Sequence, residues 1–497
     1  MSTIIDTVKA ASPSLECDAT ATNQPSLKGD MGVASVFFSV VAWAAPLLVV
    51  VGLIPSMIGF SGQGVVVSFA MTTIILLLFS VGYTTITRYV ERPGAFYTYI
   101  VAGLGRPAGL GGALVATFSY LIMLLSTWVA FGVFGHQLVV DTFHGPNVPW
   151  WALAAMAIVV IGVLSSWSVE MSAKVLTFAL LLEIVVVVIF EAYVFGSGGP
   201  DGISLTPFTW KGASEASFGL GLLFAVLCFI GFESSALYRE ETRNPEVTIP
   251  RATYLAVISI GLFYIVAAWA VVTALGADGV TGAKTADVTY MFSQLATRYV
   301  GKLLSDVTNF LMVTSTFACL LSLHNGVTRY AYSLGRDGVF PHHFGRAHAR
   351  FHSPYFASTF ISAMSLVATV VIAAATGFES AGTDAYTIYI RVNGIGTLGV
   401  LFLMCFVSIA ILAFFRKHRE IRSGRLWSTF VAPGLALIGL IAIFVLAVLN
   451  VSTLVGASVG VSVLLAAVLP LVFAAGVAYA LWLRAVRRHI YQRIGRQ

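Results

Sequence analysis

Apolar residues fill long runs that recur along nearly the whole chain after residue 33, with polar residues in the gaps between them. A helix needs about 20 mostly apolar residues to cross the hydrocarbon core of a bilayer. We therefore expect an all-α polytopic membrane protein with 12 transmembrane helices. The predicted spans are residues 34–59, 65–89, 108–136, 150–168, 172–195, 216–238, 251–275, 301–332, 354–376, 386–414, 427–450 and 455–483.

The polar segments divide the chain further. Residues 1–33 are rich in Ser, Thr, Ala and Asp and lack an apolar block after a basic start, which predicts a disordered cytoplasmic tail rather than a signal peptide. Spans one to ten form a core over residues 34–414, and a short interfacial helix is expected between spans two and three. The rest is a cytoplasmic basic loop (415–426), two peripheral helices (427–483) and a basic cytoplasmic tail (484–497).

Composition narrows the class of protein. Hydrophobic residues make up 58% of the 497 positions and charged residues only 10%, whereas soluble domains carry roughly 25% charged residues. The net charge of +6 does not indicate a nucleic-acid partner, because the positive residues lie in short segments between the spans. The cysteines Cys17, Cys228, Cys319 and Cys405 are far apart and form no CxxC pair. We expect no disulfide framework, no metal site and no cofactor.

The basic residues also predict the orientation. An even number of spans places both termini on one side of the membrane. With a cytoplasmic N-terminus, only five of the 28 Lys and Arg residues fall on the outer side: Lys211, Lys284, Arg298, Lys302 and Arg391. Because Lys and Arg concentrate in cytoplasmic loops, we expect both termini in the cytoplasm and the protein in the cytoplasmic (inner) membrane.

Two spans are interrupted. The first contains Pro46 and Pro55, and proline removes a helical N–H donor. The sixth contains Gly231, with the carboxylate of Glu233 two residues further on. Such a charge costs about 3 kcal/mol in a bilayer unless it has a partner or lines a wet cavity. Spans one and six hold matching places in two five-helix halves, which favours an inverted repeat with broken helices at a transport site.

Three motifs carry a resemblance that covers nearly the whole chain after residue 33. They are FIGFE at 229–233 with EETRNP at 240–245 and IPR at 249–251, GAFYTY at 94–99 with GLG at 103–105, and Arg329 with GRDG at 335–338 and Pro341. The chain resembles the amino acid–polyamine–organocation superfamily of permeases, specifically bacterial amino-acid permeases. The resemblance implies a five-plus-five inverted-repeat core that works by alternating access.

The resemblance also implies a substrate site at the two breaks. The substrate amine would meet freed carbonyls near Leu227, Cys228 and Ile230, and a carboxylate would meet N–H groups around Val49 and Val50. The other residues implied are Pro46, Ser119, Tyr120, Phe229, Gly231 and Phe232, although Tyr120 could also be a packed tyrosine with its hydroxyl satisfied. Members of the superfamily usually carry a GxG sequence in helix one, where this chain has LVV at 48–50. That departure favours an amine or an unusual acid.

Two carboxylates are candidates for proton coupling. Glu183 lies in the fifth span, and in resembling permeases an ionisable residue there stands near helices one and eight and can replace a bound sodium ion. The alternative for Glu183 is a hydrogen-bonded packing role. Glu233 serves either as a proton or cation site or as a helix cap. Glu191 is expected to be interfacial.

Two further features leave alternatives open. The small residues Ser315, Cys319, Ser322 and Gly326 on span eight indicate either close helix packing or a cation site. Arg391 is expected either to extend outward or to enter the cavity.

The sequence thus predicts a secondary active transporter of amino acids or related amines, coupled to protons. Its partners are the small-molecule substrate, protons and the lipid bilayer. The main alternative is an exchanger without ion coupling. An enzyme is not expected, because no HExxH, GxSxG or DxD-type constellation stands in a suitable context.

Overall fold

A computed structural model describes residues 31–90, 95–167, 173–210, 217–348, 353–418, 420, 425–456 and 458–495. The first half of the described chain forms a series of helices. They are α2 (Val33–Ala44), α3 (Pro46–Leu48), the π-helix η1 (Val49–Leu53), α4 (Ile54–Ser61), η2 (Gly62–Gly64), α5 (Val65–Ile86), α6 (Ala95–Leu104), α7 (Arg106–Gln137), η3 (Leu138–Thr142), α8 (Trp150–Ser166), α9 (Ala173–Ser197), η4 (Thr206–Phe208), α11 (Phe218–Phe229) and the 3₁₀ helix η5 (Phe232–Glu241).

The second half continues in the same way. It consists of α12 (Pro245–Gly282), α13 (Val288–Tyr299), α14 (Lys302–Arg336), η6 (His342–Gly345), α15 (Tyr355–Ala375), α16 (Thr383–Lys417), η7 (Trp427–Val431), α18 (Ala432–Leu449), α19 (Val451–Val455), α20 (Val459–Val486) and α21 (Arg488–Arg493). The short helix predicted between spans two and three is α6. Residues 1–30 of the predicted tail, Gly94 of the second motif, residues 419 and 421–424 of the basic loop and residues 496–497 lie outside the described residues.

Ten segments of the described chain are long and apolar enough to cross a membrane. The first, Val33–Ile86, is 54 residues long and contains the first predicted span and most of the second, which was predicted to end at residue 89. The fourth predicted span corresponds to the shorter helix Trp150–Ser166. The structure therefore confirms an all-helical polytopic membrane protein. The count of 12 and the inverted repeat stay predictions.

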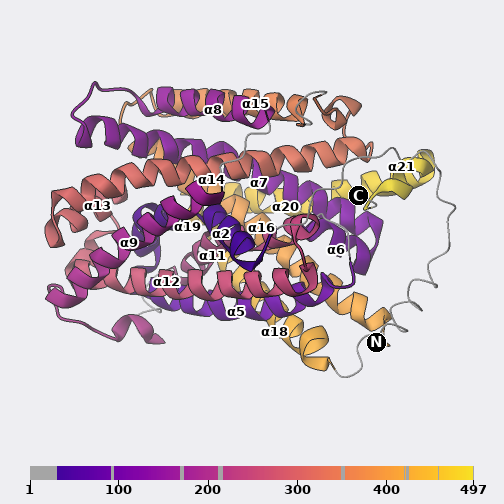
Figure 1. The fold of residues 1–497 in the computed structure, drawn as a ribbon, viewed down its shortest axis with the longest axis horizontal. Coiled ribbons are helices and arrows are strands. Elements are labelled where there is room, and N and C mark those ends of the chain that lie inside the picture. Colours follow the sequence, from indigo (N-terminus) through magenta and orange to yellow (C-terminus); the bar gives the residue numbers. More distant parts are fainter. Residues whose placement is uncertain are drawn as a thin grey trace.

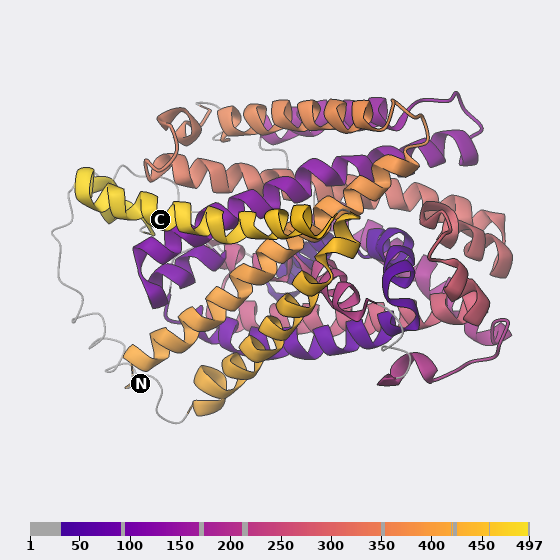
Figure 2. The same cartoon turned by 180° about the vertical axis from the view of Figure 1, so that it is seen from behind.

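The long helices run roughly along the longest axis of the molecule (Figure 1). Helix α7 packs against α16 and α20, and α5 packs against α12 and α18. Helices α8 and α15 pair with each other along one edge, which both views show (Figures 1 and 2). Helices α2, α9 and α14 contact one another, and α2 also contacts η5. The two interrupted helices therefore meet inside the bundle.

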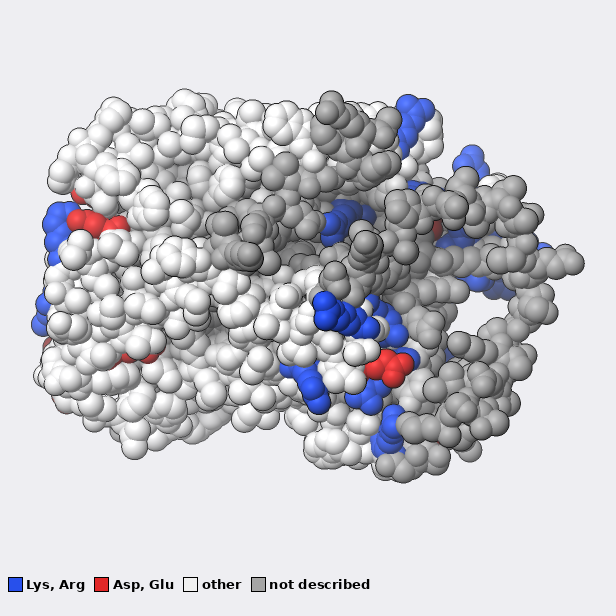
Figure 3. Space-filling view, in the orientation of Figure 1, with Lys and Arg blue, Asp and Glu red and all other residues white. Residues whose placement is uncertain are grey.

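The end of the chain is docked on the bundle. Ile490 and Ile494 of the predicted basic tail are buried, and the N–H of Gly495 donates to the hydroxyl of Tyr97 at 2.8 Å. Helix α21 thus lies at the same end of the molecule as α6, whereas α13 lies at the other end (Figure 1). Lys and Arg side chains gather at the α6 end, with few at the opposite one (Figure 3).

The two ends of α12 provide a test of orientation. Glu246 and Asp278 are both exposed and lie near opposite ends of this helix. In a background without native cysteines, we expect a membrane-impermeant maleimide applied to intact cells to label Asp278→Cys and not Glu246→Cys. Labelling of Glu246→Cys alone would reverse the predicted orientation.

Candidate functional site

The first interruption lies between α2 and α3. Ala45 adopts a left-handed conformation with φ 44° and ψ 68°, and the next residue, Pro46, has no N–H. The N–H of Leu47 donates to the Oε2 atom of Glu183 at 3.4 Å, whereas the N–H of Val49 donates to the Ala45 carbonyl at 3.2 Å. The helix therefore breaks one residue before the predicted Pro46, and a side-chain carboxyl group receives one of the N–H groups that the break frees.

Glu183 joins three helices at this break. It is 4% exposed, and its Oε2 atom also accepts the hydroxyl of Ser315 at 3.0 Å. Its contacts thus connect α9 with α3 and α14. No cationic side chain of the described residues pairs with it, so neutral donors alone stabilise this carboxyl group.

The second interruption lies between α11 and η5. Ile230 has ψ 129°, which turns its carbonyl out of the helical ladder, and Gly231 has φ 119°. Glu233 closes this break, because its Oε2 atom accepts the N–H of Gly231 at 2.8 Å and its Oε1 atom accepts the hydroxyl of Tyr120 at 2.6 Å. The hydroxyl of Tyr83 donates to the Glu233 carbonyl at 2.8 Å. Glu233 therefore caps the break and also faces α7.

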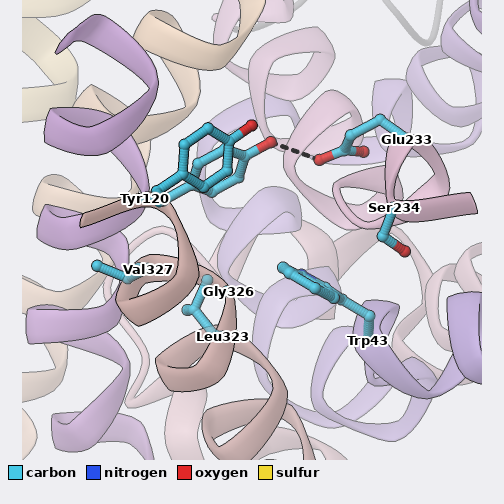
Figure 4. Close-up of a pocket in the computed structure, with 8 residues that line it drawn as sticks. Trp43, Tyr120, Glu233, Ser234, Leu323, Gly326 and Val327 are labelled. Carbon is cyan, nitrogen blue, oxygen red and sulfur yellow. Dashed lines mark hydrogen bonds between the residues drawn. The ribbon is translucent and has the colours of Figure 1, made fainter. Parts of the chain in front are cut away.

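A small cavity lies beside the second break. Its volume is about 10 Å³, which is roughly the minimum for one water molecule. Trp43 lies across the cavity from Tyr120 and Glu233 (Figure 4). The lining residues are Trp43, Tyr120, Glu233, Ser234, Leu323, Gly326, Val327 and Tyr330. The cavity is therefore closed to a substrate of amino-acid size in this conformation.

Two glycines make room for the indole of Trp43. A Cβ atom on Gly231 would lie 2.7 Å from Trp43 Cδ1, and one on Gly326 would lie 2.7 Å from Trp43 Cη2. The sulfur of Cys319 also donates to the Trp43 carbonyl at 3.5 Å. Part of the small-residue face of α14 thus packs closely against α2, as the packing interpretation predicts.

Three other residues implied by the resemblance point elsewhere. Phe229 packs on Tyr264 of α12, with the ring centroids 6.0 Å apart, and Phe232 packs on Phe79 of α5 at 5.9 Å. The hydroxyl of Ser119 has no partner among the described residues and lies against Gly399 of α16. None of the three lines the cavity.

The remaining predicted residues are buried around the two helix breaks. The Leu227 carbonyl accepts the N–H of Ile230 at 3.0 Å, so it already has one donor. At the first break, the N–H of Val49 is engaged by the Ala45 carbonyl and that of Leu47 by Glu183. The other predicted residues near the breaks are Pro46, Val50 and Cys228, and each of them is buried.

Two further residues were placed by expectation outside the site. Glu191 is 8% exposed, and its Oε1 atom is buried without a partner among the described residues, while its interfacial position stays a prediction. The guanidinium of Arg391 lies against Gly456, which ends α19, and Arg391 does not line the cavity.

Sequence reasoning did not assign five of the lining residues to the site: Trp43, Ser234, Leu323, Val327 and Tyr330. Trp43 is the only tryptophan in the first predicted span and stands three residues before Pro46, which is a signal that could have identified it. Tyr330 follows Arg329 of the third motif. Its position beside Tyr120, with the ring centroids 5.9 Å apart, depends on how α7 and α14 pack and has no local sequence signal.

A second, larger pocket opens on the opposite side of the first break. It has a volume of about 490 Å³ and is lined by residues of α4, α16 and the segment between α12 and α13, including Ser56, Lys284 and Tyr386. The hydroxyl of Tyr386 donates to the carbonyl of Gly52 in η1 at 2.9 Å. This contact joins α16 to the interrupted first helix.

The hydrogen bond between Tyr120 and Glu233 leads to a stability prediction. Tyr120→Phe leaves the buried Oε1 atom of Glu233 without its donor, and a hydrogen bond to such a group contributes roughly 1.5–3 kcal/mol if the carboxyl group is charged. We expect a lower thermal unfolding midpoint in detergent than for Tyr193→Phe, a matched change on an exposed tyrosine. Equal midpoints would mean that this hydrogen bond does not stabilise the break.

Comparison with known proteins agrees with this architecture. The model of the amino acid permease family matches residues 32–474. The low-affinity putrescine importer PlaP of Escherichia coli K12 is 23% identical over 62% of this chain and 68% of its own length. The branched-chain amino acid permease BcaP of Bacillus subtilis is 22% identical over 76% of this chain and 79% of its own length. The gamma-aminobutyric acid permease of B. subtilis is 23% identical over 58% of this chain and 61% of its own length.

The family match spans both interrupted helices, the cavity between them and most of the remaining bundle. It also agrees with the three motifs that carry the resemblance in the sequence. The chain belongs to the amino acid permease family, and it is a transporter rather than an enzyme.

Proposed function

We propose that this permease carries amino acids or related amines across the cytoplasmic membrane by alternating access, with protons as the coupling ion. The observation that carries the proposal is the pair of buried carboxyl groups at the two helix breaks. Glu183 accepts the N–H that the first break frees, and Glu233 accepts the N–H of Gly231 at the second. A proton taken up or released at either residue therefore acts directly on a helix break.

Glu183 is the better candidate for coupling. It contacts α3 and α14 at once, so its protonation changes hydrogen bonds between two helices that must separate or close during transport. Protonation removes the charge that Leu47 N–H and the Ser315 hydroxyl stabilise, and it adds an O–H donor in place of an acceptor. Glu183 thus has a chemical means of favouring one conformation over another.

The two pockets support alternating access. On one side of the first break, a pocket of about 490 Å³ is open, whereas on the other side the cavity beside Glu233 has only about 10 Å³. In the predicted orientation the larger pocket faces outward. The inner side is closed by Trp43 and by contacts of Met31 with Thr242 and Arg243. Transport in this scheme requires the inner contacts to open while the outer pocket closes.

The names of the relatives set the range of substrates to test. They include a putrescine importer, a branched-chain amino acid permease and a gamma-aminobutyric acid permease. The test is uptake of a radiolabelled panel of amino acids and amines into proteoliposomes, with and without an inward proton gradient. We expect accumulation of at least one compound that the gradient increases.

Protein-free liposomes are the control for leakage of the panel compounds. If the gradient has no effect but preloaded unlabelled substrate drives uptake, the chain is an exchanger and the proton coupling is wrong. If no compound of the panel enters under either condition, the proposed transport function fails.

A further inference from the structure

Two of the sequence motifs contact each other through one buried hydrogen bond. Tyr97 of α6 belongs to the second motif, and Asp337, which directly follows α14, belongs to the third. The hydroxyl of Tyr97 donates to the Oδ2 atom of Asp337 at 3.2 Å, and both side chains are buried. Neither residue lines the cavity beside the second break. The contact therefore needs an explanation other than substrate binding.

A short segment of the chain packs over this contact. It comprises residues 487–495 with the helix α21, and we call it the strap. Ile490 and Ile494 are four residues apart in the strap, and both are buried, whereas Gln492 between them is exposed. The isoleucines pack in one apolar cluster with residues of α6, α7, α14 and α20, among them Tyr97, Leu110, Leu334 and Leu483. The strap is thus docked by its apolar face.

The strap bridges α6 and the end of α14. Near its start, Ile490 lies against Gly338, where a Cβ atom would come 3.4 Å from Ile490 Cδ1. At its end, the N–H of Gly495 donates to the Tyr97 hydroxyl at 2.8 Å. A Cβ atom on Gly495 would lie 2.9 Å from Val101 Cγ1, and Gly495 has φ 75°, so only glycine fits well here. A segment fixed to both elements opposes any motion that separates them.

Helix α6 leads from the strap to the second helix break. Tyr99 lies two residues after Tyr97, and its ring packs on that of Tyr83 in α5 with the centroids 5.3 Å apart. The hydroxyl of Tyr83 in turn donates to the carbonyl of Glu233 at 2.8 Å. Helix α6 also contacts η5 directly. Packed side chains therefore link the position of α6 to the segment that follows the break.

The cavity beside Glu233 lies between α14 and η5. Leu323, Gly326, Val327 and Tyr330 of α14 line it together with Glu233 and Ser234 of η5. For a substrate to pass to the cytoplasm, these two elements have to move apart. Because α6 contacts η5, such a motion also draws the end of α14 away from α6. The strap spans these two elements and opposes that motion.

We propose that the strap holds the cytoplasmic side of the permease closed, and that its release allows this side to open. The inference rests on the proposed alternating access and on the predicted orientation, in which the end of the molecule with α6 and α21 faces the cytoplasm (Figure 1). It adds a regulatory element of the chain itself. In the present conformation the strap is docked, and the cavity has a volume of only about 10 Å³.

The native Cys319 can report on the opening. It lies on α14, and its sulfur donates to the Trp43 carbonyl at 3.5 Å, so it stands beside the closed cavity. The other native cysteines are replaced by alanine, and a membrane-impermeant maleimide is applied to the cytoplasmic side of inside-out vesicles. The measured quantity is the rate at which Cys319 is labelled. Labelling needs no substrate, so its outcome is independent of the uptake experiment.

Two variants of the full chain release the strap in different ways. Ile494→Asp places a charge in the apolar cluster, and Gly495→Val brings a side chain against Val101. We expect each to raise the labelling rate at least about fivefold, because release shifts the population towards the open conformation. Gln492→Asp adds the same charge on the exposed face of α21 and should label at the wild-type rate.

The two variants also protect the test against a folding defect. Gly495→Val adds only apolar atoms after the last described helix, so it stays informative even if Ile494→Asp does not reach the membrane. An unchanged or lower labelling rate in either variant that reaches the membrane would overturn the inference, and uptake of panel compounds by the wild type would still support the proposed function.

Discussion

Replacing Gly231 by leucine is expected to abolish uptake while the protein still inserts into the membrane. Gly231 has φ 119°, a backbone conformation that costs a residue with a side chain roughly 1–3 kcal/mol. A Cβ atom there would also lie 2.7 Å from the indole of Trp43, well inside van der Waals contact. The larger leucine side chain would displace Trp43 and disrupt the cap that Glu233 forms.

The measurement is uptake in proteoliposomes that contain equal amounts of each protein. Gly231→Ala should retain a small fraction of the wild-type rate, because it has the backbone strain and only one added carbon atom. Gly434→Leu is the matched control, since Gly434 lies in α18 and a Cβ atom there meets nothing within 4 Å. Near-normal uptake by Gly231→Leu would show that the substrate path does not pass this break.

Replacing Glu183 by glutamine is expected to remove proton stimulation and to leave substrate exchange. Glutamine keeps the shape of the side chain and retains an oxygen that can accept the hydrogen bonds from Leu47 N–H and the Ser315 hydroxyl. It cannot gain or lose a proton, so it mimics the neutral carboxylic acid. Substrate counterflow should therefore stay near the wild-type rate, whereas an inward proton gradient should no longer increase accumulation.

Glu191→Gln is the matched control for this experiment. Glu191 lies on the same helix and is also buried, but no hydrogen bond connects its side chain to α3 or α14 among the described residues. We expect this variant to keep its response to the gradient. If Glu183→Gln keeps full proton-driven accumulation of substrate, Glu183 is not the coupling residue. Its hydrogen-bonded packing role is then the better interpretation.

The sequence was informative wherever the type of a single residue determines the local backbone conformation. Pro46 lacks an N–H, and Gly231 tolerates positive φ, so both interruptions could be predicted from residue type alone. The carboxyl groups of Glu183 and Glu233 could also be identified from the sequence, because a charged residue in an apolar run is unusual. What the sequence could not provide was the set of partners, such as Leu47 N–H for Glu183, since these depend on how distant helices meet.

The side chains near the second break illustrate a different limit. The resemblance implied that Phe232 shapes the pocket, but η5 is a 3₁₀ helix over Phe232–Glu241. Gly231, directly before it, has φ 119°, so the chain enters η5 in a different direction from an uninterrupted α-helix. Phe232 packs on Phe79, while Glu233 faces Tyr120. Trp43 was missed because an aromatic residue in an apolar span is usually packing.

Simultaneous recording of substrate and proton flux tests proton-coupled transport most directly. Purified protein is placed in proteoliposomes that contain a pH-sensitive dye, and radiolabelled substrate is added outside without any imposed gradient. We predict that substrate entry acidifies the interior, and that both fluxes saturate at the same substrate concentration and disappear together in Gly231→Leu. Substrate accumulation with no change in internal pH would contradict the account.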